Sequence, residues 1–104
     1  MRFLALARSD DAWFDALSPA AAADRLRAEA QRVWDLYQDG VIRDIRFRTD
    51  RVDVVIELEA PDEAAARAVL ATLPLAAAGA IEFELIGLRP YDGWARLFGT
   101  DSGS

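Results

Sequence analysis

Two charged residues lie beside apolar ones in positions where their side chains could do chemistry. Arg43 falls on the side of an alternating segment that otherwise carries Ile45 and Phe47, and Glu29 borders the apolar stripe of a predicted helix. A guanidinium on an apolar face needs an acceptor, because a buried unpaired charge is costly. Arg43 could hold a substrate carboxylate while Glu29 moves a proton, or the two could form a structural ion pair.

Aromatic side chains are plentiful for a chain with twenty-one alanines: Trp13, Phe14, Trp34, Tyr37, Tyr91 and Trp94. Rings of this kind line pockets for flat organic ligands. We assign Trp34, Trp13 and Tyr91 to substrate binding, and Tyr37 to proton transfer beside Glu29. The alternatives are that Trp34 and Tyr37 fill gaps in a small-residue core, and that Tyr91 and Trp94 form a subunit contact.

The composition excludes several kinds of catalyst. The chain has no Cys, no His and no Lys, and all twelve basic residues are Arg. It therefore has no thiol nucleophile, no Ser-His-Asp triad, no imidazole metal ligand and no Schiff-base lysine. Proton chemistry falls to Asp, Glu, Tyr, Arg or water, and we expect no metal and no cofactor. Carboxylates on the predicted sheet alternate with Arg, which favours ion pairing at an interface.

Length and charge narrow the class of protein further. With 104 residues and a net charge of −6, the chain reads as one domain over residues 1–99, followed by a disordered tail over 100–104. The acidic balance argues against a nucleic-acid partner. The sequence contains no apolar run long enough to span a membrane, and the apolar run after Arg2 is too short for a signal peptide. We expect a cytoplasmic protein.

Hydrophobic periodicity and capping residues predict the elements that position these residues. A short strand over 3–8 is followed by a loop that carries Trp13 and Phe14. Ser18-Pro19 begins a helix that ends near Asp39, before Gly40. Its predicted stripe consists of Leu26, Ala30, Val33 and Tyr37. Strands over 41–48 and 52–59 form a hairpin, a helix follows from 60 to 73, a strand covers 81–86, and an aromatic tail covers 89–98.

This order, βαββαβ, predicts a ferredoxin-like α+β fold: a four-stranded antiparallel sheet with two helices on one face. The other face would carry charged residues, Asp53 among them, and six apolar side chains: Leu4, Leu6, Ile42, Val55, Ile86 and Leu88. A monomer would leave these side chains in water. We therefore expect a homo-oligomer, at least a dimer, in which two sheets meet face to face as a dimeric α+β barrel.

Several short motifs resemble the muconolactone isomerase-like family of the dimeric α+β barrel superfamily. They are Gly40-Val41-Ile42-Arg43 after a helix, Leu73-Pro74-Leu75, Ile81-Glu82, and a final Leu88 with a Pro soon after. The resemblance covers about residues 18–91, and Glu29, Leu36 and Arg43 fall on positions similar to that family's. The chain departs from the family where it has Asp44 and Arg89-Pro90 in place of His.

The resemblance implies a small homo-oligomeric enzyme that acts without metal or nucleotide on a small cyclic acid or lactone. The leading hypothesis is a cofactor-independent isomerase-like enzyme for a small unsaturated acid, lactone or polyketide-like ring. Arg43 would anchor the substrate, and Glu29, with Tyr37, would carry the proton. Two alternatives stay open: a cofactor-free monooxygenase or cyclase on the same scaffold, and a non-catalytic dimeric small-molecule-binding or accessory protein.

Overall fold

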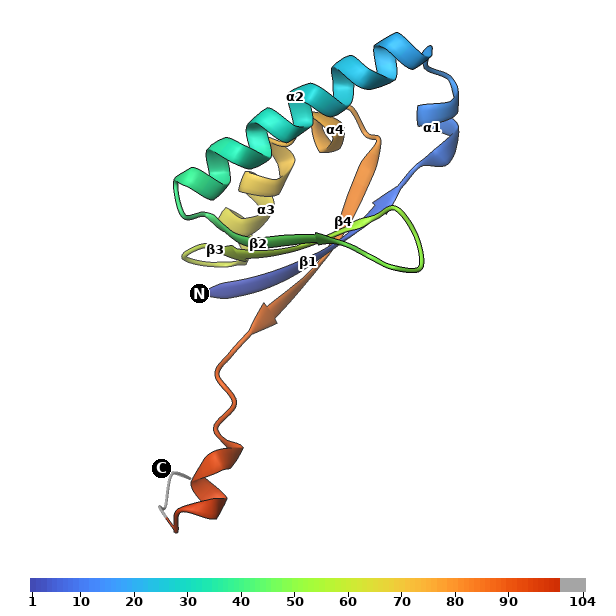
Figure 1. Cartoon of the computed structure of the whole chain (residues 1–104). Helices are drawn as coiled ribbons and strands as arrows, with labels where there is room; N and C mark the ends of the chain where they lie inside the picture. Colours follow the sequence, from blue (N-terminus) through green and yellow to red (C-terminus); the bar gives the residue numbers. More distant parts are fainter. Residues whose placement is uncertain (100–104) are drawn as a thin grey trace.

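The structure, a computed structural model, describes residues 1–99 and contains a four-stranded antiparallel sheet covered on one face by helices (Figure 1). The strands lie in the order β2-β3-β1-β4. The elements are β1 (Arg2–Ser9), α1 (Asp11–Asp15), α2 (Pro19–Gln38), β2 (Ile42–Phe47), β3 (Val54–Glu59), α3 (Glu63–Ala71), α4 (Pro74–Ala77), β4 (Ile81–Leu88) and the 3-10 helix η1 (Gly93–Leu97). The predicted ferredoxin-like α+β fold is confirmed. The tail over 100–104 lies outside the described residues.

Three short helices were not predicted, and α1 replaces an expected loop. Its N-cap is Asp10, whose carboxylate accepts a hydrogen bond from the Trp13 backbone N–H at 3.4 Å. The helix predicted over 60–73 is α3, which is shorter: it begins at Glu63, after the N-cap Asp62, and ends at Ala71. Pro74, which fits the first turn of a helix because it has no N–H to leave unpaired, then begins α4.

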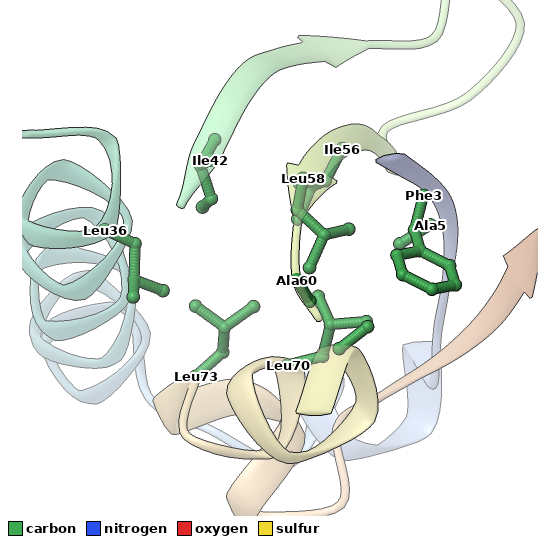
Figure 2. Close-up of a cluster of buried hydrophobic side chains, with 10 residues drawn as sticks. Phe3, Ala5, Leu36, Ile42, Ile56, Leu58, Ala60, Leu70 and Leu73 are labelled. Atoms are coloured by element: carbon green, nitrogen blue, oxygen red, sulfur yellow. The ribbon is translucent and has the colours of Figure 1, made fainter. Parts of the chain in front are cut away.

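The core lies between the inner face of the sheet and helices α2, α3 and α4. Alternate residues of β1 and β3 point into it, so that Phe3, Ile56 and Leu58 are almost fully buried. Figure 2 shows these side chains with Leu70 and Leu73 of the helical layer. Burial of such apolar side chains, each contributing about 1.5–3 kcal/mol, is what holds the two layers together.

Helix α2 touches this core only near its C-terminal end. Leu36 is the one buried residue among its twenty, and Figure 2 shows its side chain directed toward the core. The helix begins as predicted, because the Ser18 hydroxyl accepts a hydrogen bond from the Ala21 N–H at 3.2 Å. It ends before Gly40, whose φ of +76° is unfavourable for residues with a side chain.

The predicted stripe of α2 is rotated from the observed one. The inner side carries Glu29, Val33 and Leu36, spaced i, i+4 and i+7, whereas Tyr37 is 51% exposed. Trp34 is also exposed, so the prediction that Trp34 and Tyr37 fill the core is wrong. The more tightly packed Leu36, which lies one position before Tyr37, sets the orientation of the helix.

A β-bulge in β2 corrects the predicted position of Arg43. Ile42 is opposite Leu58 and Asp44 is opposite Glu57, so Arg43 is the extra residue of the bulge. Because of this extra residue, strict alternation fails. Ile42 is buried in the core rather than on the outer face, and Arg43 is exposed. The predictions for both side chains, made by counting every second residue, were wrong.

The chain after β4 forms an arm that stands away from the sheet (Figure 1). Its apolar side chains face solvent: Tyr91, Trp94, Leu97 and Phe98 are all more than half exposed. The Tyr91 and Trp94 rings pack edge to face, with their centroids 5.0 Å apart, so these two side chains contact each other within the arm. No helix within residues 1–99 is both long enough and apolar enough to cross a membrane.

Candidate functional site

A cleft of about 620 Å³ opens between α2 and the sheet, beyond the point where Leu36 closes the core. Its walls are mostly apolar. They are formed by Leu26, Ala30 and Val33 of α2, by Ile45, Phe47, Val54 and Ile56 of the sheet, and by Phe14, Val52, Leu75 and Ile81 around them. Several of these side chains face open space, with Phe47 71% and Val52 82% exposed. An apolar cleft of this size suits a small organic ligand.

Glu29 places a carboxylate in this cleft. Its Oε1 accepts a hydrogen bond from the backbone N–H of Leu75 at 3.0 Å. Leu75 lies in the first turn of α4, and the N-cap residue Leu73 has no side-chain acceptor for that turn. Glu29 therefore serves as the missing cap and links α2 to α4 across the cleft wall.

The surroundings of Glu29 favour its protonated form. Burial among apolar side chains raises the pKa of Glu29, and the Leu75 N–H, which lowers it, offsets only part of this effect. No Arg forms an ion pair with Glu29 in the part of the chain that the structure describes. A carboxyl group in this setting can both give and take a proton at a bound ligand.

A second polar group enters the cleft from the sheet. Ser9 ends β1, and Asp53 lies directly before β3. Asp53 Oδ1 accepts hydrogen bonds from the Ser9 backbone N–H at 3.1 Å and from the Ser9 hydroxyl. Its Oδ2 pairs with Arg51 Nε at 2.7 Å. The prediction that Asp53 lies on the outer charged face is therefore wrong: it precedes the strand, outside the strand alternation, and is buried.

Arg43, unlike Glu29, does not line the cleft. Its charge acts instead on Glu59, whose pKa is lowered first by a hydrogen bond to the N-terminal ammonium and further by Arg2 and Arg43. Arg2 and Glu59 are opposite each other in the sheet, on its outer side. The expected contact between Arg43 and Glu29 is thus not formed, because the bulge has turned Arg43 away.

The predicted aromatic residues are also outside the cleft lining. Trp34 and Tyr37 stack on each other at 5.9 Å on the exposed side of α2. Trp13 packs edge to face on Phe14, which does line the cleft, and the guanidinium carbon of Arg25 lies 5.7 Å from the Trp13 ring centroid. The proposed roles of these residues in binding or catalysis stay predictions.

Tyr91 lies on the arm, which leaves the sheet at Leu88. The cleft is lined by Ile81, at the other end of β4, so the strand separates the two. A substrate-binding role for Tyr91 likewise stays a prediction. Within residues 1–99, no three acidic side chains converge as a metal site would require.

A search of solved structures finds the fold in a known enzyme. The crystal structure of muconolactone isomerase matches with a TM-score of 0.72, and the match covers 89% of this chain and 93% of that one. The two sequences are 20% identical, so this likeness concerns the fold. No protein-family model matches the chain, and no curated protein does. The fold that the short motifs implied is therefore confirmed.

The raised pKa of Glu29 predicts a pH-dependent effect of Glu29→Gln on stability. Between the ordinary pKa of Glu and the raised pKa of Glu29, the folded chain keeps the carboxyl proton that the unfolded chain has released. The contribution of Glu29 to the free energy of unfolding therefore falls as the pH rises through that range. In the variant this loss is absent, and the Gln carbonyl still accepts from Leu75. We expect urea denaturation to show that the free energy of unfolding of the variant increases relative to that of the wild type as the pH rises above the ordinary pKa of Glu.

Glu29→Ala is the matched contrast. It removes the charge and also the acceptor, leaving the Leu75 N–H unpaired, and is expected to cost about 1–2 kcal/mol in the free energy of unfolding. A constant difference between Glu29→Gln and the wild type over the whole pH range would show that burial does not govern this carboxyl.

Proposed function

We propose that the chain is a cytoplasmic, cofactor-independent isomerase-like enzyme that moves a proton on a small unsaturated acid, lactone or polyketide-like ring. One observation carries the proposal: the Glu29 carboxyl lies in an apolar cleft, held by a backbone N–H and paired with no cation in residues 1–99. The shared fold with muconolactone isomerase supports the same class of reaction.

Glu29 would act as the base and then as the acid. Its free carboxylate takes a proton from a carbon next to the substrate carbonyl, and the electron pair of that C–H bond moves into the conjugated system. The carboxyl group then returns the proton to the far carbon of that system, so the double bond shifts and no atom is gained or lost. Burial raises the pKa of Glu29, so the free-energy cost of protonating this carboxylate at neutral pH is smaller than for an exposed carboxylate.

The open cleft argues against an accessory protein whose helix–sheet space is filled, and turnover is what separates an enzyme from a non-catalytic small-molecule-binding protein. The accessory hypothesis expected Trp34 and Tyr37 to fill the space between helix and sheet, and Glu29 to pair only with Arg43. Neither arrangement is present: the two rings are exposed, and Glu29 faces a cleft of about 620 Å³. The space between α2 and the sheet is thus available to a ligand.

Turnover by Glu29→Gln tests this proposal. The neutral α-angelica lactone is a suitable probe, with the double-bond shift followed by absorbance and by deuterium uptake from D₂O. We expect Glu29→Gln to lower kcat/KM by about 10²–10⁴-fold, because Gln cannot carry the proton. Glu63→Gln, an exposed change on α3, is the control.

Full turnover in Glu29→Gln would contradict the assignment of Glu29. Oxygen consumption with a quinol-type compound, together with no isomerisation of the lactone, would instead favour the cofactor-free monooxygenase.

We further propose that the protein is a homo-oligomer, at least a dimer. Two apolar surfaces lack a partner within residues 1–99. One is the outer sheet face, which carries Leu4, Leu6, Val55, Ile86 and Leu88. The other is the arm, on which four large apolar or aromatic side chains are each more than half exposed. A second copy placed sheet to sheet would cover the first of them.

Sedimentation velocity tests the oligomer. We expect a species of at least twice the chain mass of 11.4 kDa, and we expect Ile86→Arg on the outer face to shift it toward the monomer. Tyr37→Arg, at an exposed site on α2, is the matched control. A wild-type species of one chain mass at micromolar concentration would contradict the proposal.

A further inference from the structure

The Ser9–Asp53 pair gives the cleft a hydrogen-bonding group of a particular kind. The Asp53 side chain is only 9% exposed, and both of its carboxylate oxygens already have partners, Ser9 on one and Arg51 on the other. The Ser9 hydroxyl gives its single proton to Asp53. Its oxygen then keeps only acceptor capacity, and Ser9 lines the cleft. Ser9 can therefore accept a hydrogen bond from a ligand but has no proton left to donate.

The charged side chains that line the cleft are all acidic. Asp11, Glu29 and Asp53 line it, and no Arg does within residues 1–99. The guanidinium of Arg51, two residues before Asp53, already forms an ion pair with the Asp53 carboxylate. Arg43, expected to hold a substrate carboxylate, is exposed and does not line the cleft. An anion in this cleft would lose its hydration without gaining a counter-charge, which is costly among apolar walls.

We propose that the cleft selects an uncharged, largely apolar ring compound that carries a hydroxyl or N–H donor, with Ser9 Oγ accepting from that donor. The volume of about 620 Å³ fits a compound of one or two rings. The inference rests on the proposed function for taking the cleft as the substrate site. It narrows the substrate class to uncharged lactones, phenol-like rings and polyketide-like rings that bear a hydroxyl or N–H group, and it removes free carboxylic acids.

Three naphthalene probes separate the contributions of charge and of the donor. Calorimetric titration of the full-length protein at neutral pH would compare 2-naphthol, which is uncharged and has a donor, with 2-methoxynaphthalene, which lacks the donor, and with 2-naphthoate, an anion. We expect 2-naphthol to bind at least about tenfold more tightly than 2-naphthoate and about fivefold more tightly than 2-methoxynaphthalene.

Ser9 variants test whether Ser9 Oγ is the atom that accepts the hydrogen bond from the ligand. Ser9→Ala is expected to bring 2-naphthol and 2-methoxynaphthalene to about equal affinity, while Ser9→Thr, which keeps a hydroxyl, preserves the preference. Equal or tighter binding of 2-naphthoate, no binding of 2-naphthol, or an unchanged preference in folded Ser9→Ala would each overturn the proposal. If Ser9→Ala does not fold, the comparison of the three probes on the wild type still decides the charge preference.

Binding is measured without turnover, so the two proposals fail separately. Loss of the proton-transfer role of Glu29 would appear as full activity in Glu29→Gln, with the probe preferences intact. If the cleft does not prefer uncharged ligands, 2-naphthoate will bind tightly, whatever Glu29→Gln does to the isomerisation of a lactone.

Discussion

The hydrogen bond from the Leu75 N–H to Glu29 is the contact on which the site depends. The first turn of α4 has an N-cap, Leu73, that cannot cap, and its next residue, Pro74, has no N–H, so Leu75 carries the N–H that needs an acceptor. Glu29 meets that need from the inner side of α2. In return, the carboxyl is held in an apolar cleft, where its charged form is disfavoured. One contact therefore links the packing of α2 and α4 to the raised pKa of the Glu29 carboxyl.

The same arrangement explains why so much apolar surface is left open. Helix α2 reaches the core through Leu36 near its end, so Leu26 and Ala30, one to three turns earlier, face a cleft instead of a packed sheet. Phe47 and Val52 are mostly exposed on the other side of that cleft. Apolar side chains in these positions contribute little to the stability of the empty chain, whereas a bound ligand ring would cover them. The fold thus leaves apolar area open between α2 and the sheet.

Local signals were sufficient for the elements, and tertiary contacts decided the site. Ser18-Pro19 and Gly40 predicted the ends of α2 because caps act within one turn, and the order of strands and helices followed from them. The placement of Glu29 near the apolar stripe was a correct signal for the cleft. The bulge at Arg43 could not be predicted, since a bulge depends on which residue of the neighbouring strand each residue pairs with. Nor could the pairing of Ser9 with Asp53, which are 44 residues apart and meet only when β1 lies beside β3.

The most direct test of the account is the titration of Glu29 itself, followed by the ¹³C shift of its side-chain carboxyl carbon in the NMR spectrum. Titrations of the free protein and of the protein saturated with 2-methoxynaphthalene, which carries neither charge nor donor, should be compared. We expect a pKa above the ordinary Glu value in the free protein and a further rise when the ligand displaces water from the cleft. A pKa at or below the ordinary value, unchanged by the ligand, would contradict the claim that Glu29 is the proton-carrying group of an apolar site.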